Sequence, residues 1–481
     1  MSLNSKNLIN RILGFSLATW VNCLITFIST PIVTALFVPE ELGKVNLFVT
    51  CANVITPFVY IGFDQAFARF YHEPPSKNTS HSLGRICILF STSFFLVAST
   101  VVFMIREYIS EKIVGYYFGP IVISLMAFVF AEYVMRYTQL NARMQNNILQ
   151  YSIQSIIVTL VIKISFVLVA LVRPSAEYAI MFRSSCYLLV AIIFVSLFLR
   201  QGRNEKMYID KETCSELSKF AVPLFPTHFL VALNNSLPMF MLSKYASYSD
   251  IGIYSNAVTI ASIVTVVQSG LTIFWTPFVY EYYKTEKRKL QLMHHVISIC
   301  VIGFGFLLIL CQFPIYRILV AQQYWQSREI FALLVLSPVC YTISETLGIG
   351  IDLAKKTYLK LPVYAINIAI NFLASILLVP RYGVFGAAMA TAAASLVMLV
   401  TKASLGNKYY RCSDNYLKLV VGISTLTGAG LANMFILGNT KYLIIGALMV
   451  LCMAIYRKEI EIVISEGKKY LTEAMSHRGE K

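Results

Sequence analysis

Runs of about 20 apolar residues recur along the whole 481-residue chain. A helix of that length crosses the hydrocarbon core of a bilayer, because each residue adds about 1.5 Å and the core is about 30 Å thick. Charged residues make up 13% of the sequence, well below the fraction typical of soluble domains. The sequence therefore predicts an all-α polytopic membrane protein with about 14 transmembrane helices and no sizeable soluble domain.

The basic residues alternate between the two sides of the predicted membrane. With the N-terminus in the cytoplasm, about three quarters of the 40 Lys and Arg residues fall on the cytoplasmic side. Cytoplasmic segments of membrane proteins carry this excess of positive charge. We therefore expect both ends of the chain in the cytoplasm. The net charge of +16 then belongs to loops that face anionic lipid, and we expect no nucleic-acid partner.

One short segment recurs, which indicates an internal repeat. Glu41-Leu42-Gly43-Lys44-Val45 resembles Asp250-Ile251-Gly252-Ile253-Tyr254, and each segment opens a long span. The same offset places the first predicted span on the seventh and the second on the eighth, which predicts two pseudo-symmetric six-helix halves. The expected parts are residues 1–199 (N-terminal half), 200–218 (cytoplasmic linker), 219–403 (C-terminal half), 404–456 (two extra transmembrane helices) and 457–481 (basic cytoplasmic tail).

Several function classes are excluded by what the loops contain. No loop is long enough for an ATPase domain, and the Walker pattern GxxxxGK[ST] does not occur. The ten cysteines show no CxxC spacing, so we expect neither a disulfide framework nor a metal site. Function is therefore expected within the helix bundle. Two halves without an ATPase domain favour transport by alternating access, in which the cargo binds between the two halves.

A set of motifs follows a recognisable order between residues 37 and 391. They are FVPEELG at 37–43, IGF at 61–63 with Ala66 and Arg69, LSKFAVPL at 217–224, GIYS at 252–255, WTPF at 275–278, AKKT at 354–357, Asn367 and Asn371, LVPRYG at 378–383 and GAAMAT at 386–391. In these motifs the chain resembles the polysaccharide-transporter (Wzx-type) flippases of the multidrug/oligosaccharidyl-lipid/polysaccharide (MOP) superfamily. It departs from them at Asn235-Ser236-Leu237-Pro238, where relatives often carry an acidic-basic pair.

The resemblance implies both a fold and a cargo. It implies a MATE/MOP-like bundle that moves undecaprenyl-pyrophosphate-linked oligosaccharide repeat units, of O-antigen (lipopolysaccharide), capsule or a related polysaccharide. The movement would run from the cytoplasmic to the periplasmic leaflet of a bacterial inner membrane. The protein would then be a transporter and not an enzyme. Its partners would be the lipid-linked glycan, the bilayer, a polysaccharide polymerase and a chain-length regulator.

Three basic residues are candidates for binding the pyrophosphate of such a cargo. Arg69 ends the second predicted span, Lys163 lies in the middle of the fifth, and Arg183 lies about two turns into the sixth. A charge at the bilayer centre costs at least about 2.5 kcal/mol, so it indicates function. Each also has a structural interpretation. Arg69 would be an interfacial anchor, Lys163 a partner for an acid on another helix, and Arg183 a side chain that snorkels outward.

Two asparagines complete the candidate substrate site. Asn367 and Asn371 share a face of the eleventh predicted span, because they are four residues apart. On that face they would line the glycan path. Interhelical hydrogen bonding explains them equally well.

Acidic residues within the predicted spans are candidates for coupling transport to H+ or Na+. They are Asp64, Glu132 and Glu345, and we expect no other cofactor. The spacing of Glu132 and Arg136 favours an ion pair along one helix. Asp64 would otherwise pair with a nearby base. Glu345 is expected deep and unpaired, where burial would favour its protonated form.

Two other functions compete with the flippase interpretation. One is an ion-coupled multidrug or small-molecule exporter of the same fold, whose cavity would be acidic and aromatic rather than cationic. The other is a membrane-embedded polysaccharide polymerase, which would display a long external loop. The predicted external loops are short, which argues against the polymerase. His228 follows two prolines of the seventh span and is interpreted as a packed, hydrogen-bonded side chain.

Overall fold

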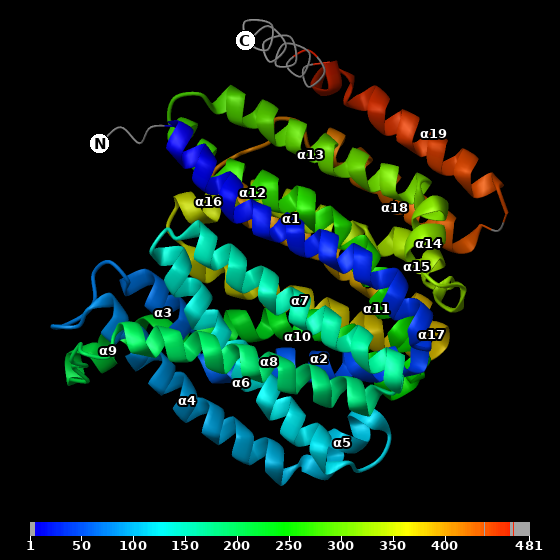
Figure 1. The fold of residues 1–481 in the computed structure, drawn as a ribbon. Coiled ribbons are helices and arrows are strands. Elements are labelled where there is room, and N and C mark those ends of the chain that lie inside the picture. Colours follow the sequence, from blue (N-terminus) through cyan, green and yellow to red (C-terminus); the bar gives the residue numbers. More distant parts are fainter. Residues whose placement is uncertain (1–4, 437, 462–464, 466–481) are drawn as a thin grey trace, which may run out of the picture. The chain divides into compact units, whose positions relative to one another are not determined.

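The computed structural model describes residues 5–436, 438–461 and 465, and these fold into helices with no strand among them (Figure 1). In chain order the α-helices are α1 (Ser5–Leu36), α2 (Pro39–Tyr60), α3 (Phe63–Phe70), α4 (Ser80–Met104), α5 (Arg106–Val114), α6 (Gly119–Met144), α7 (Ile148–Val172), α8 (Ala176–Gln201), α9 (Lys211–Ala221), α10 (Phe225–Tyr245), α11 (Tyr248–Ala261), α12 (Ile263–Tyr282), α13 (Lys287–Leu310), α14 (Gln312–Leu319), α15 (Ser327–Leu334), α16 (Leu336–Leu353), α17 (Lys360–Tyr409), α18 (Tyr416–Phe435) and α19 (Thr440–Ile455). The all-α membrane fold expected from the apolar runs is confirmed.

Among the described residues, 11 helical segments are long and apolar enough to cross a membrane. One of them, Thr357–Tyr409, contains α17, whose backbone leaves helical geometry at Gly383 (φ 53°, ψ −125°). This positive φ suits glycine, and it divides α17 into two helices. Helices α10 and α19, of 21 and 16 residues, are not among the 11. The arrangement is consistent with the expected count of about 14 spans.

The lengths and order of the helices repeat along the chain. A shift of 209 residues separates Asn46 from Ser255, which form a hydrogen bond. The same shift carries α4 onto α13, α6 onto α15 and α16, and α8 onto the second part of α17, with small differences at the ends. The two halves inferred from a single pentapeptide therefore have a counterpart in the helix boundaries. Helices α18 and α19 follow the second half.

The chain packs into two compact units. Unit 1 comprises Met1–Ser255, Arg317–Tyr324 and Ser375–Ala387, and unit 2 comprises Asn256–Tyr316, Trp325–Ala374 and Ala388–Lys481. Within unit 1, α6 packs against α2, α4, α7 and α8, and α7 and α8 run side by side (Figure 1). Helix α6 is apolar on most sides and largely buried, as expected for a central helix. The residue limits expected for the two halves remain a prediction.

Within unit 1, the first turns of α2 and α11 meet at two glycines. A Cβ atom on Gly43 would lie 1.8 Å from the backbone oxygen of Tyr248. A Cβ atom on Gly252 would lie 2.0 Å from the backbone oxygen of Pro39. Gly43 and Gly252 are related by the repeat offset, and so are Pro39 and Tyr248. The contact is therefore reciprocal, because the glycine of each repeat packs against the backbone of the other repeat.

The segment expected to link the two halves is held to the start of α4. Asn78 donates to the backbone oxygen of Tyr208 and accepts from its N–H, both at 2.9 Å. Asp210 accepts from Ser76 Oγ at 2.6 Å and from the N–H of Thr213 at 2.8 Å, and so it caps α9. These hydrogen bonds lower the pKa of the Asp210 carboxyl group to about 2, and the bond from Ser76 has the largest effect.

Candidate functional site

A polar cavity of about 260 Å³ lies in unit 1. It is lined by residues of α2, the α2–α3 turn, α3, α6 and α10, namely Asn53, Thr56, Pro57, Tyr60, Gly62, Asp64, Glu132, Arg136 and His228. The side chains of Asn53, Arg136 and His228 are exposed although they belong to helices of the bundle. Polar side chains at membrane depth normally face a hydrated space, so these three mark an opening to water.

A break between α2 and α3 places Asp64 in this cavity. Ile61 and Gly62 have left-handed backbone conformations, with φ of 44° and 84°. Gly62 has no substitute here, because a Cβ atom would lie 2.4 Å from the backbone oxygen of Ala221. Helix α3 then starts afresh, and Asp64 falls in its first turn, where the helix dipole favours a negative charge.

Asp64 is paired with a base, as one of its two interpretations anticipated. Arg136 donates from Nε and Nη2 to Asp64 Oδ2, both at 3.3 Å, and Gln65 donates to the same oxygen at 2.8 Å. The expected ion pair between Glu132 and Arg136 is wrong for the described part of the chain, where the partner of Arg136 is Asp64. The physical reason is that the α2–α3 break brings a second carboxylate within reach of the guanidinium.

Glu132 has a neutral partner instead. Tyr187 of α8 donates to Glu132 Oε2 at 2.9 Å, and Tyr60 donates to the Glu132 backbone oxygen at 3.4 Å. The carboxylate is also an electrostatic neighbour of Arg183 and of Arg136. Glu132 therefore connects the cavity with the next cation inside the bundle.

Arg183 and Lys163 form a pair of neighbouring cations in unit 1. The Arg183 guanidinium lies over the ring of Phe128, 5.2 Å from its centre, and its buried Nε has no hydrogen-bond partner among the described residues. Arg183 is close enough to Lys163 to repel its charge. Lys163 has neither a hydrogen bond nor an ion pair within the described ranges, so the acid partner considered for it is not seen there. The packed helices α7 and α8 thus each carry a basic group inside the membrane-spanning part, and the two groups are electrostatic neighbours.

Of the other residues singled out from the sequence, Arg69 lies apart from the polar cavity and His228 lines it. Arg69 lies in the last turn of α3, and its side chain is 55% exposed. Its Nη1 atom lies 3.6 Å from Oε2 of Glu73. It does not line the cavity. His228 does line it and is exposed, with no hydrogen bond to any described residue, so its interpretation as a packed histidine is wrong. The position of His228 after two prolines did not predict the cavity, because the cavity forms only where several helices pack together.

In unit 2 the expected unpaired carboxylate has a partner. Glu345 of α16 accepts from Lys402 of α17, whose side chain is only 3% exposed. The stem of Lys402 crosses α16 at Gly348, where a Cβ atom would lie 2.7 Å from Lys402 Cε. The expectation that Glu345 is unpaired is therefore wrong, because the absent side chain at Gly348 leaves room for the lysine.

Asn367 and Asn371 are both buried in unit 2, with 4% and 1% of their surface exposed. Asn367 Nδ2 lies 3.5 Å from the sulfur of Met398. Their burial fits the interhelical interpretation of the pair, and their proposed contact with a glycan remains a prediction.

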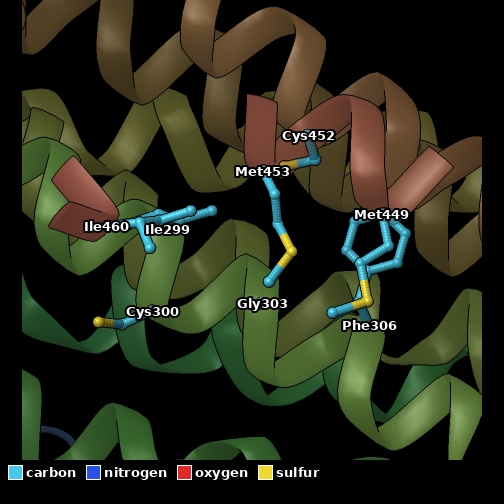
Figure 2. Close-up of a pocket in the computed structure, with 8 residues that line it drawn as sticks. All are labelled: Ile299, Cys300, Gly303, Phe306, Met449, Cys452, Met453 and Ile460. Carbon is cyan, nitrogen blue, oxygen red and sulfur yellow. The ribbon is translucent and has the colours of Figure 1, made fainter. Parts of the chain in front are cut away.

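An apolar pocket of about 190 Å³ lies between α13 and α19 of unit 2. Its lining is almost entirely carbon and sulfur and consists of Ile299, Cys300, Gly303, Phe306, Met449, Cys452, Met453 and Ile460. Figure 2 shows Met453 reaching from α19 toward Gly303 of α13, with Met449 beside Phe306. Methionine side chains adapt easily to irregular apolar ligands. Hydropathy gave no signal of this pocket, since lipid-facing and pocket-facing apolar residues look alike in a sequence.

Comparisons with known proteins agree with this architecture. The model of the family described as "Polysaccharide biosynthesis protein" matches residues 10–277. No match to a curated protein sequence was found. The solved structure of the lipid II flippase MurJ in an inward closed conformation has a TM-score of 0.69 and 15% identity, covering 93% of this chain and 99% of that one. The structure of the MATE multidrug transporter DinF-BH has a TM-score of 0.60 and 14% identity, covering 85% and 97%. At such identities the likeness shows the fold, which is of the MATE/MOP type.

Proposed function

Because the chain belongs to the polysaccharide biosynthesis protein family of MOP-type flippases, we propose that it moves an undecaprenyl-pyrophosphate-linked oligosaccharide across a bacterial inner membrane. The oligosaccharide would be the repeat unit of O-antigen, capsule or a related polysaccharide. Movement would run from the cytoplasmic to the periplasmic leaflet by alternating access, without any covalent chemistry. The observation that carries the proposal is the Arg183 guanidinium inside the membrane-spanning part of unit 1, whose buried Nε has no hydrogen-bond partner among the described residues and which has a second cation, Lys163, as an electrostatic neighbour.

Glu132 offsets part of the charge of Arg183, whereas Lys163 has no ion pair within the described ranges, so the two cations can still accept an anion. Each of them raises the cost of the other, and a membrane protein retains such charges where they serve function. A pyrophosphate ester supplies several acceptor oxygens in a small volume. The planar fork of Arg183 suits bidentate binding of one phosphate, and Lys163 adds a point charge for the other. We therefore assign the pyrophosphate to this pair.

The lipid part of the cargo has a fitting site in unit 2. A polyprenyl chain is apolar and branched at regular intervals, so it needs a pocket that is lined by carbon and sulfur and adapts in shape. The pocket between α13 and α19 has both properties. We propose that this pocket accepts an apolar chain of that kind.

The balance of charge in unit 1 favours this cargo over a cationic drug. An exporter of cations would present more carboxylates than cations to its substrate, whereas here Arg136, Arg183 and Lys163 outnumber Asp64 and Glu132. Here Asp64 is neutralised by Arg136, and Glu132 is the remaining carboxylate of the cavity. Since Asp64 and Glu345 each have a cationic partner, we propose Glu132 as the group that couples transport to H+ or Na+.

The test is a lipid analysis in the native host. Deletion of the gene should make undecaprenyl-pyrophosphate-linked oligosaccharide accumulate while the surface polysaccharide disappears. The wild-type gene and the variant Lys77→Gln, which removes an exposed lysine of the α3–α4 loop, should restore the polymer. Lys163→Gln and Arg183→Gln should not restore it.

A different outcome would contradict the proposal. If deletion leaves both lipid and polymer unchanged while sensitivity to cationic compounds rises, the protein is an exporter of the same fold. If Lys163→Gln and Arg183→Gln both restore the polymer as well as Lys77→Gln does, the pyrophosphate is bound elsewhere.

A further inference from the structure

We propose that the polar cavity of unit 1 binds a single sugar ring of the cargo, the ring attached to the pyrophosphate, through its free hydroxyl groups. The inference rests on the proposed function and adds a determinant of substrate choice. The residues that would select the sugar are Asn53, Asp64, Glu132 and His228.

The cavity presents carboxylate oxygens that are open to a ligand. The three hydrogen bonds to Asp64 all end on Oδ2, and the bond to the Glu132 carboxylate ends on Oε2. Asp64 Oδ1 and Glu132 Oε1 therefore have no hydrogen-bond partner among the described residues. A carboxylate oxygen in a membrane protein needs a donor, and a hydroxyl bound to a carboxylate forms a strong, charge-assisted bond. A sugar ring carries several such hydroxyls at fixed spacing.

Neutral groups beside the carboxylates can meet the rest of a sugar ring. The amide of Asn53 offers both donors and an acceptor, and the imidazole of His228 offers one of each. Neither side chain has a hydrogen bond to a described residue, and both belong to exposed residues that line the cavity. They are therefore free to bind a ligand without breaking an internal contact.

The size of the cavity limits its occupant to one ring. Sites for drug-sized ligands measure roughly 300–1,000 Å³. At about 260 Å³, this cavity lies just below that range. It suits a monosaccharide and is too small for a whole repeat unit, whose outer sugars would extend into water.

The cavity is joined to the cations that we assign to the pyrophosphate. Tyr187 binds Glu132 at 2.9 Å, and Arg183, one helical turn before Tyr187 on α8, is an electrostatic neighbour of the same carboxylate. Lys163 follows next to Arg183. A pyrophosphate on Arg183 would bring its attached sugar toward Glu132, the carboxylate that Arg183 neighbours, and so toward the cavity. The distal sugars need no contact with these residues.

The experiment measures the binding of defined lipids to the full chain in nanodiscs by native mass spectrometry. The probes are undecaprenyl pyrophosphate, the same lipid bearing one hexose or one N-acetylhexosamine, and the lipid-linked oligosaccharide extracted from the native host. We expect at least one of the two single-sugar lipids to bind about tenfold more tightly than bare undecaprenyl pyrophosphate, which corresponds to about 1.4 kcal/mol. Asn53→Ala should remove most of that advantage and change the binding of the bare lipid by less than about twofold.

Matched variants separate this inference from the proposed function. Asn204→Ala removes an exposed asparagine of the linker and should bind every probe like the wild type. Lys163→Gln should weaken binding of all probes together. If all probes bind equally, and Asn53→Ala and Asp64→Asn change nothing, the sugar pocket is refuted while the flippase proposal stands. If no pyrophosphate lipid binds and Lys163→Gln has no effect, the proposed function itself fails.

Discussion

Replacing Gly43 or Gly252 by alanine should force apart the first turns of α2 and α11. The new methyl group on Gly43 would lie 1.8 Å from the backbone oxygen of Tyr248, and the one on Gly252 would lie 2.0 Å from that of Pro39. Real Cβ contacts fall no closer than 3.0 Å, and neither obstacle is a side chain that can rotate away. The helices themselves must therefore move.

The size of the effect follows from the packing. Overpacking a close contact typically costs about 1–3 kcal/mol. In a transporter that alternates between two states, this cost falls on the state in which α2 and α11 touch. An effect of about 1–3 kcal/mol shifts such an equilibrium by about 5- to 150-fold. Because our predicted orientation places this contact on the periplasmic side, each substitution should favour the state that is open to the periplasm.

Cysteine cross-linking reports the contact directly. Asn46 Nδ2 and Ser255 Oγ are 2.5 Å apart, so cysteines at these two positions should be joined by a short bifunctional thiol reagent. The ten native cysteines are replaced first, and a protease site is inserted between Gly202 and Asp210. After cleavage, cross-linked fragments remain together on a denaturing gel. Gly43→Ala and Gly252→Ala should lower the cross-linked fraction.

Gly270→Ala is the control, because no atom lies within 4 Å of the position that its Cβ would occupy. It should cross-link like the parent. If Gly43→Ala and Gly252→Ala also cross-link like the parent, the two backbones are not closely packed in the working protein, and the argument from the reciprocal contact is refuted.

Two further predictions concern the ion pair in unit 2 and the linker. Lys402→Ala leaves Glu345 without its cation and should destabilise the protein by about 3 kcal/mol. The measurement is the Tm in detergent, which should fall. The double variant Lys402→Met with Glu345→Gln should recover part of the lost stability. An unchanged Tm in Lys402→Ala would show that the pair does not form. Because the pKa of Asp210 is lowered to about 2 from an ordinary value of 3.8, its stabilisation of α9 is full above pH 4 and is lost as the pH falls through about 2. Hydrogen exchange of the first amides of α9 should speed up across that window in the wild type and not in Asp210→Asn, and identical profiles would contradict the capping role.

The candidate site shows where sequence reasoning succeeds and where it stops. Asp64, Glu132, Lys163 and Arg183 stand out in the sequence because charges are rare and costly in apolar spans, and the structure connects all four within unit 1. Their partners could not be predicted. Arg136 pairs with Asp64, 72 residues away, and not with Glu132 one turn along its own helix. Helical periodicity reports neighbours on one helix and carries no information about the helix opposite.

The sequence by itself determined that this chain spans a membrane many times and is built as a repeat, because both properties follow from local hydropathy and from similarity at a fixed offset. It also marked Gly43 and Gly252 as equivalent positions. Only the tertiary structure decided that each of these glycines receives the other repeat's backbone, that Gly348 leaves room for Lys402, and which charges meet around the polar cavity. Those outcomes depend on contacts between residues far apart in the chain, and such contacts are selected by the packing of whole helices.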